Sequence, residues 1–237
     1  MTRLSVNINK IATIRNARGG VIPNLLEAAR RIESFGGQGI TVHPRPDERH
    51  IRYEDVRQLR PVVRTELNVE GYPSRAWLDL VIESKADQAT LVPDAPDAIT
   101  SNSGWDTIKN QSFLGEVVAE LKSHGIRTSI FIDTDSGRIN AAADLGVECV
   151  ELYTEPFALQ FLNDPDAAVS PFIEAAKCAQ SCGLMINAGH DLSLENLRFF
   201  HDHLPYLDEV SIGHALISDA LYFGLENTVQ MYLAKLQ

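Results

Sequence analysis

Residues that can move protons or bind anions follow several short apolar segments of this sequence. In the segment ITVHPRPDERH, His43, Arg45 and His50 come directly after or close behind an apolar, β-branched run. Glu70 stands at the end of a second such run and His190 at the end of a third. Imidazole and carboxyl groups exchange protons near neutral pH when burial tunes their pKa values, and arginine binds phosphate. These residue types predict acid/base chemistry on an anionic ligand, if the fold brings them together.

Eight short β-rich runs alternate with longer stretches of helical periodicity. The expected strands are 4–9, 39–44, 65–71, 88–93, 127–133, 149–154, 184–190 and 209–214. Strands that are apolar throughout and are separated by helices are typical of a parallel sheet covered by helices. Eight such units in 237 residues predict an α/β protein with a (β/α)8 TIM barrel and extra helices, as one domain over residues 1–237. A doubly wound open sheet is the alternative.

In a barrel of this kind, residues at the carboxyl ends of the strands form the active site. The polar residues expected there are Asn7, Asn9, His43, Arg45, Asn68, Glu70, Asp133, Glu151, Asn187, His190 and His214. Such residues are costly to bury unless they are paired. Their repetition at one end of the barrel therefore predicts a shared site, and Glu70, His43 and His190 are expected to converge in it.

Two regions of this barrel mouth are expected to bind anions. Gly189 and Gly213, with His214, stand at the turns after the last two strands, where backbone N–H groups at a helix N-terminus commonly hold a phosphate. The second region contains Arg45, Arg49 and His50, although Arg49 is more simply explained as part of a solvated loop. Two anion sites indicate two phosphorylated ligands or one bisphosphate.

The segment IRNARGG is expected to add a flexible basic loop after the first strand, with Arg15 and Arg18 as its cations. A polar segment, 94–107, is expected to form a mobile cover after the fourth strand. Both are long connections in a fold whose loops carry the function.

The amino-acid composition limits the classes of molecule that this protein is expected to bind. A net charge of −11 and a pI of about 5.0 disfavour nucleic acid and anionic membranes, so small phosphorylated molecules are the expected ligands. We expect a cytoplasmic protein, since no export signal or long apolar run is recognisable and three cysteines do not suit a disulfide framework. A zinc hydrolase using His43, His190, His214, Glu70 and Asp133 is a weaker alternative, because no H-x-H follows the first strand.

Motifs along nearly the whole chain resemble the pyridoxine 5′-phosphate synthase family. They are VNIN.IATIRNARGG, GITVH.R.D.RHI, L.LVP, FID, NAGHDL and IGHALI, in this order and spacing. The resemblance implies condensation of 3-amino-2-oxopropyl phosphate with 1-deoxy-D-xylulose 5-phosphate, giving pyridoxine 5′-phosphate, phosphate and water, by Schiff-base formation and acid/base ring closure. It implies no metal and no other cofactor, and it implies a homo-octamer.

The same resemblance implies roles for individual residues. His43 and Glu70 match the family's proton acceptors, His190 a further acid/base residue and Glu151 a transition-state stabiliser. The implied substrate contacts are Asn7, Arg18, Gly213 and His214 for the aminoketone phosphate and Arg45, His50 and Thr100 for the pentulose phosphate, with Asn9, Lys10 and Asp191 as further binding residues.

The sequence departs from the common family pattern at several of these positions. Asn9 and Lys10 stand where many members have aspartate and histidine, and Asp191 stands where some have glycine. Lys10 is expected to replace the histidine as a phosphate contact. Two other hypotheses stay open: another phosphosugar barrel enzyme, of the epimerase or indole-glycerol-phosphate synthase type, and a non-catalytic barrel used in assembly.

Overall fold

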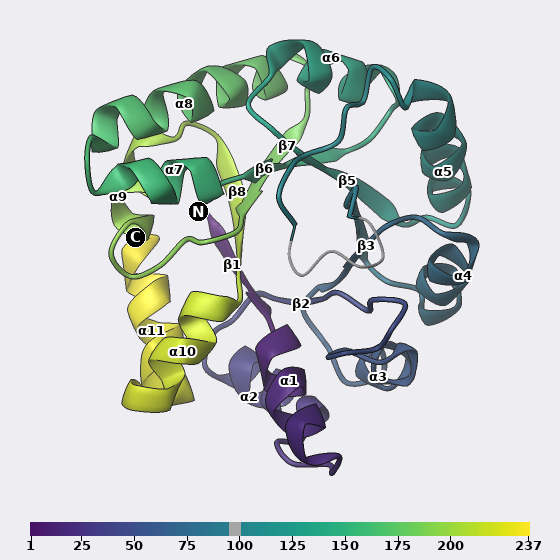
Figure 1. The fold of residues 1–237 in the computed structure, drawn as a ribbon, viewed down its shortest axis with the longest axis vertical. Coiled ribbons are helices and arrows are strands. Elements are labelled where there is room, and N and C mark those ends of the chain that lie inside the picture. Colours follow the sequence, from purple (N-terminus) through teal and green to yellow (C-terminus); the bar gives the residue numbers. More distant parts are fainter. Residues whose placement is uncertain (95–100) are drawn as a thin grey trace.

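Eight parallel strands close into a barrel with helices around its outside (Figure 1). The computed structural model describes residues 1–94 and 101–237. The strands are β1 (Arg3–Asn7), β2 (Gly39–Val42), β3 (Leu67–Gly71), β4 (Gln88–Leu91), β5 (Arg127–Ile132), β6 (Cys149–Tyr153), β7 (Met185–Gly189) and β8 (Leu207–Ile212). They follow one another around the barrel in chain order, and β8 pairs with β1 through Leu4 and Val210. The TIM barrel is confirmed, and closure excludes the open sheet.

This barrel has more than one helix after some of its strands. They are α1 (Asn9–Arg18), α2 (Leu25–Ser34), α3 (Tyr53–Leu59), α4 (Arg75–Ser84), α5 (Gln111–Ser123), α6 (Ser136–Asp144), α7 (Glu155–Phe161), α8 (Pro165–Ser181), α9 (Leu197–His203), α10 (His214–Phe223) and α11 (Leu225–Lys235). The connections after β1, β6 and β8 each contain two helices, so the expected extra helices are present. Within the described ranges, no helix has the length and hydropathy needed to cross a membrane.

Side-chain caps explain where several helices begin. The Ser74 hydroxyl accepts a hydrogen bond from the Trp77 backbone N–H at the start of α4, and Asn24 accepts one from Glu27 at the start of α2. Asp164 caps α8 in the same way, with Pro165 in the first turn. These helices bury apolar faces against the outside of the barrel, whose residues include the fully buried Leu4 and Val6.

The inside of the barrel is polar, so the expectation of strands that are apolar throughout is wrong for the inward face. The Ser5 and Thr41 hydroxyl oxygens lie 2.7 Å apart, Asn68 donates to Thr41, and Thr90 donates to Asn68 over 3.0 Å. All four side chains are buried. Hydrogen bonds between neighbouring strands satisfy these groups, which makes their burial tolerable. This polar layer lies one step below the carboxyl ends of the strands.

The segment expected to be a flexible basic loop is helix α1, and that prediction is wrong. The helix ends at Gly19, whose φ of 72° is in the left-handed region that glycine adopts without strain. Ile11, Ala12 and Arg15 are its buried residues. No glycine or proline interrupts residues 9–18, and packing of this face stabilises a helix that has weak periodicity in the sequence.

Part of the expected cover lies outside the described residues. Residues 95–100, Thr100 among them, belong to that part. On either side, the Ser101 hydroxyl donates to Asp94 over 2.9 Å, and the Gly104 N–H donates to Asp133 over 3.0 Å.

Candidate active site

A cavity of about 570 Å³ opens at the carboxyl ends of the strands. Twelve residues predicted from the sequence line it: Asn7, Asn9, Lys10, His43, Arg45, His50, Glu70, Glu151, His190, Asp191, Gly213 and His214. Residues from six strands or their following turns thus meet in one volume, as parallel strands with a common direction require.

Several other polar residues from the sequence analysis do not line the cavity. Arg18 is exposed at the far end of α1, nine residues beyond Asn9 and so about 13 Å further along the helix axis. Asn68 and Asn187 are buried inside the barrel and do not line the cavity. Asp133 bonds the Gly104 N–H and forms an ion pair with Arg138 at 2.7 Å.

Glu70 and His43 form a coupled acid/base pair. The Oε2 atom of Glu70 lies 3.6 Å from Nδ1 of His43, and both side chains are nearly buried. Burial raises the pKa of Glu70 to about 7, and the charge of Asp94 adds to this effect. Burial lowers the pKa of His43 to about 4, with a further contribution from Arg45. Near neutral pH the imidazole is therefore neutral and the carboxyl group is close to half-protonated, so the pair can accept or donate a proton.

Glu151 lies deeper, on β6. Burial raises the pKa of Glu151 well above its usual range, with the charge of Glu70 as the second cause. This shift favours the neutral carboxylic acid, which can donate a hydrogen bond. Gly189 on the adjacent strand makes room for it, because a Cβ atom at Gly189 would lie 2.2 Å from Oε1 of Glu151.

The pKa of His190 is shifted in the opposite direction to the pKa of His43. Its Nδ1 atom lies 3.2 Å from Oδ2 of Asp191. Burial lowers the pKa of His190, but the hydrogen bond and charge of Asp191, followed by the charges of Glu155 and Glu70, outweigh burial and raise it overall. The cavity therefore contains two imidazoles whose pKa values are driven apart.

The zinc-hydrolase alternative requires His43, His190, His214, Glu70 and Asp133 to lie together, whereas the structure groups His190 with other residues. Within the described part of the chain, the residues whose ligand atoms all lie within 4.8 Å of one another are Glu155, His190 and Asp191. The described His43, His214, Glu70 and Asp133 do not belong to such a group.

One rim of the cavity is cationic but partly neutralised. Arg45 forms a buried ion pair with Asp94, with 2.6 Å between Nη2 and Oδ2. Burial and the nearby His43 lower the pKa of His50 to about 3, so His50 is neutral. Its Nδ1 accepts a hydrogen bond from the Ile51 N–H over 2.9 Å, which leaves the ring proton on Nε2. Lys10, at the start of α1, is exposed on this rim.

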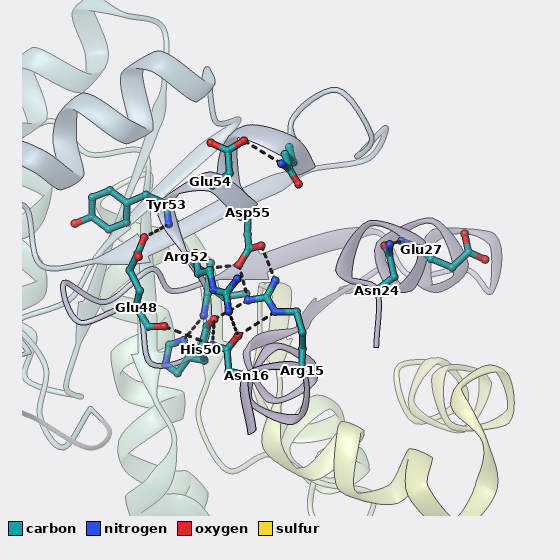
Figure 2. A network of polar contacts seen from close by, with 12 residues as sticks. Arg15, Asn16, Asn24, Glu27, Glu48, His50, Arg52, Tyr53, Glu54 and Asp55 are labelled. Atoms are coloured by element: carbon teal, nitrogen blue, oxygen red, sulfur yellow. Dashed lines mark hydrogen bonds and ion pairs between the residues drawn. The ribbon is translucent and has the colours of Figure 1, made fainter. Parts of the chain in front are cut away.

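A network of polar contacts holds this rim in place (Figure 2). Arg15 forms two hydrogen bonds with Asp55 and donates a third, from Nη2, to the His50 backbone oxygen over 3.0 Å. The Asn16 amide donates to the same oxygen over 2.8 Å. Arg15 is therefore a structural anchor for the loop that carries His50 and is not available as an anion-binding residue.

The second rim is the N-terminus of α10, which follows β8 on the other side of β1 from β2. Gly213 is its N-cap and has no side-chain capping bond, and both Gly213 and His214 line the cavity. Unsatisfied N–H groups at a helix start attract anions. A Cβ atom at Gly213 would lie 3.0 Å from the Cβ of Asn7, so glycine permits the close approach of α10 to β1.

The two asparagines after β1 link neighbouring elements. The Asn7 amide donates to Glu70 over 3.4 Å, and the Asn7 oxygen accepts from the Asn9 backbone N–H over 3.0 Å. The Asn9 oxygen accepts from the His43 N–H over 2.9 Å. Asn9 thereby orients the base of the His43 side chain.

Two acidic residues of the site were missed by sequence reasoning. Asp94 follows β4 and neutralises Arg45, and Glu155 follows β6 and lines the cavity beside His190. Both stand just beyond the end of a strand, so the rule that found the other residues could have found them.

Comparisons with known proteins show which family this chain resembles. Residues 4–237 match the family model described as pyridoxal phosphate biosynthesis protein PdxJ. The chain is 62% identical over 237 residues to pyridoxine 5′-phosphate synthase from Christiangramia forsetii, covering 100% of both chains. It is 61% identical over 234 residues to the enzyme of that name from Parabacteroides distasonis, covering 99% of this chain and 98% of the relative.

Solved structures with low identity share the fold. A phosphoribosylanthranilate isomerase from Thermotoga maritima superposes with a TM-score of 0.63 at 13% identity, covering 100% of this chain and 98% of that one. A 3-keto-L-gulonate-6-phosphate decarboxylase from Vibrio cholerae does so with a TM-score of 0.66 at 11% identity, covering 99% and 97%. These likenesses show the barrel alone. Because the family model and the relatives at about 60% identity span essentially its full length, the chain belongs to the PdxJ family of pyridoxal phosphate biosynthesis proteins.

Proposed function

We propose that this chain, as a single-domain barrel, is a pyridoxine 5′-phosphate synthase that condenses 3-amino-2-oxopropyl phosphate with 1-deoxy-D-xylulose 5-phosphate. The products are pyridoxine 5′-phosphate, phosphate and water. The observation that carries the proposal is the convergence of Glu70, His43, His190 and Glu151 in one cavity that also has two anion-attracting rims. Family membership adds support, and the relatives at about 60% identity have this name.

The reaction needs repeated proton transfer in one place. The amine of one substrate and the ketone of the other form a Schiff base, water and phosphate leave, and ring closure aromatises the product. Glu70 with His43 accepts and returns protons, since the pKa of Glu70 lies at about 7. Glu151, as a neutral acid, donates a hydrogen bond to developing negative charge, and His190 donates protons.

Each rim of the cavity binds the phosphate group of one substrate. The N-terminus of α10, with Gly213, His214 and Asn7, holds the aminoketone phosphate. Arg18 lies outside the cavity of this chain, and we leave it out of these contacts.

Lys10, Arg45 and His50 hold the pentulose phosphate on the other rim. Arg45 has five N–H donors, so its pair with Asp94 leaves donors for the ligand. The expected contact from Thr100 lies outside the described residues. Asp191 is not proposed as a phosphate contact, because its carboxylate is bonded to His190 and would repel the anion.

The test is to incubate the protein with both substrates and to follow pyridoxine 5′-phosphate by its absorbance and released phosphate by a colorimetric assay. Each substrate alone is the control. Product formation only with both substrates supports the proposal. No product under conditions where the protein is folded would remove it and reopen the other phosphosugar enzymes.

We also propose that the chain functions in the cytoplasm as a homo-octamer. Exposed apolar side chains gather on the α1–α2 connection and on α10: Val21, Ile22, Leu221, Tyr222 and Phe223. A groove of about 310 Å³ between α1, α2 and α10 includes Ile14 and Leu221. Such surfaces favour association. Light scattering after size exclusion should give about 210 kDa for eight chains of 26.2 kDa, and a mass of one chain would contradict it.

A further inference from the structure

We propose that Asp191 and Glu155 are positioning residues that together hold His190, the proton donor of the proposed function, as an imidazolium facing the cavity. The donor role rests on the proposed function, whereas the protonation state of His190 does not. Neither carboxylate belongs to the four residues to which the proposed function gives a catalytic role.

The first support is the arrangement of the three side chains. His190 Nδ1 and Asp191 Oδ2 are 3.2 Å apart, and one oxygen of Glu155 falls within 4.8 Å of both partners' ligand atoms. Asp191 therefore lies at Nδ1, and Glu155 lies close enough to the ring to act on its charge. A carboxylate at Nδ1 fixes the orientation of an imidazole and favours its charged form.

The second support is the backbone that creates this convergence. His190 and Asp191 both have positive φ, 86° and 61°, a conformation that non-glycine residues rarely adopt. In an extended strand, successive side chains point to opposite faces, so the sharp turn is what allows adjacent residues to bond each other. The Asn196 amide stabilises the turn by donating to the Asp191 backbone oxygen over 3.1 Å.

Thr154 connects this turn to Glu155. Its hydroxyl donates to the backbone oxygens of Gly189 and His190, and its N–H donates to Gly189 over 3.0 Å. Glu155 is the next residue and the first of α7. These bonds fix the start of α7 against the turn after β7, so the placement of Glu155 beside His190 is built into the backbone.

The ring itself is packed as well as bonded. The Tyr153 ring meets the His190 ring edge to face, with centroids 5.2 Å apart and planes at 72°. Tyr153 is buried. This contact limits rotation of the imidazole ring. The ring contact carries no charge, so the protonation of His190 depends on the nearby carboxylates.

Several other charged groups act on His190 and its partners. Besides Asp191 and Glu155, the acidic groups acting on it are Glu70 and Glu151, from β3 and β6. Burial raises the pKa of Glu151, which favours its neutral form, and Glu70, with a pKa of about 7, is close to half-protonated at neutral pH. The hydrogen bond from His190 lowers the pKa of Asp191, and the charge of His214 on α10 lowers it further. Asp191 is thus a full negative charge at neutral pH.

The experiment compares Asp191→Asn, Glu155→Gln and the double variant with the wild type. Nuclear magnetic resonance of ¹³C-labelled histidine, without substrate, gives the pKa of His190 after assignment with His190→Gln. The pKa should fall by about one unit or more in Asp191→Asn, by less in Glu155→Gln and furthest in the double variant. In the activity assay, the alkaline limb of the kcat/KM profile should shift to lower pH in the same order, with each KM changed less than about threefold.

A matched control comes from the same chain. His201 and Asp202 are also adjacent, with 3.1 Å between Nδ1 and Oδ1, but they lie on the surface of α9. Asp202→Asn should change neither the pKa of His190 nor the profile. Asp191→Glu should restore part of the pKa shift if charge is what matters.

Two results separate the proposals. An unchanged pKa of His190 in the folded double variant would overturn this inference even if the enzyme is active. Absence of product with the wild-type protein, together with the expected pKa changes, would overturn the proposed function and leave the inference about the charge of His190 standing.

Discussion

Arg15 on α1 and Asp55 on α3 form a bidentate ion pair, with contacts of 2.6 and 2.8 Å, between two side chains that are almost fully buried (Figure 2). The pair joins the helix that follows β1 to the helix that follows β2. Its third bond, to the His50 backbone oxygen, places the cationic rim of the cavity.

Arg15→Ala should lower the free energy of unfolding by about 3–5 kcal/mol, because it leaves Asp55 buried without its partner. Urea denaturation followed by circular dichroism measures this loss. Arg18→Ala is the matched control on the same helix, and since Arg18 is exposed it should change stability by less than about 0.5 kcal/mol. Equal effects of the two changes would contradict the anchoring role of Arg15.

Glu70→Gln should reduce kcat by about 10²-fold or more, because the amide keeps the shape of the side chain but cannot take up a proton. Steady-state kinetics with each substrate varied should show both KM values nearly unchanged. A variant with turnover close to that of the wild type would rule out Glu70 as a general base.

The same substitution should stabilise the protein at high pH. The pKa of Glu70 is about 7 in the folded protein, whereas its ordinary value, taken for the unfolded chain, is 4.5. Glu70 therefore makes its full contribution to the free energy of unfolding below pH 4.5, and this contribution is lost as the pH rises through 7. Glu70→Gln does not ionise and should gain about 1–3 kcal/mol relative to the wild type between pH 5 and pH 8. Thermal denaturation at the two pH values measures the difference, and a pH-independent difference would refute the raised pKa.

Lys10→Ala should raise the KM for 1-deoxy-D-xylulose 5-phosphate by about tenfold or more, as expected for losing a charge-assisted contact of about 1.5–3 kcal/mol. The KM for the aminoketone phosphate should change by less than about threefold, and kcat should change little. Lys109→Ala, at a lysine that is 82% exposed and pairs with Asp106, provides the control. Equal changes in both KM values would remove Lys10 from the pentulose rim.

Gly189→Ala should reduce kcat strongly, by about 10²-fold, since the new Cβ would lie 2.2 Å from Oε1 of Glu151 and must displace that carboxyl group. Gly115→Ala is the comparison: its Cβ would lie 3.7 Å from Leu145, an ordinary contact, and alanine favours the interior of α5. Kinetics and thermal denaturation of both variants test this, and full activity of Gly189→Ala would show that the position of Glu151 is not critical.

The sequence alone determined the barrel and most of the residues at its mouth, although it also placed Asn68, Asn187 and Asp133 there and missed Asp94 and Glu155. Periodicity separates strand from helix, and parallel strands share a direction, so His43, Glu70 and His190 had to reach the same end wherever each lies in the chain. The position of Glu151 at the cavity followed from the same rule.

Only the tertiary structure decided how these groups are charged and paired. Spacing along the chain does not show that Asp94 neutralises Arg45, that Arg15 pairs with Asp55 while Arg18 stays exposed, or that α1 is a helix. Those contacts join residues about 40 or more positions apart, and the energy of each depends on burial and distance. The opposite pKa shifts of His43 and His190 have the same origin, because two identical imidazoles differ here only in the charges and solvent that the fold places around them.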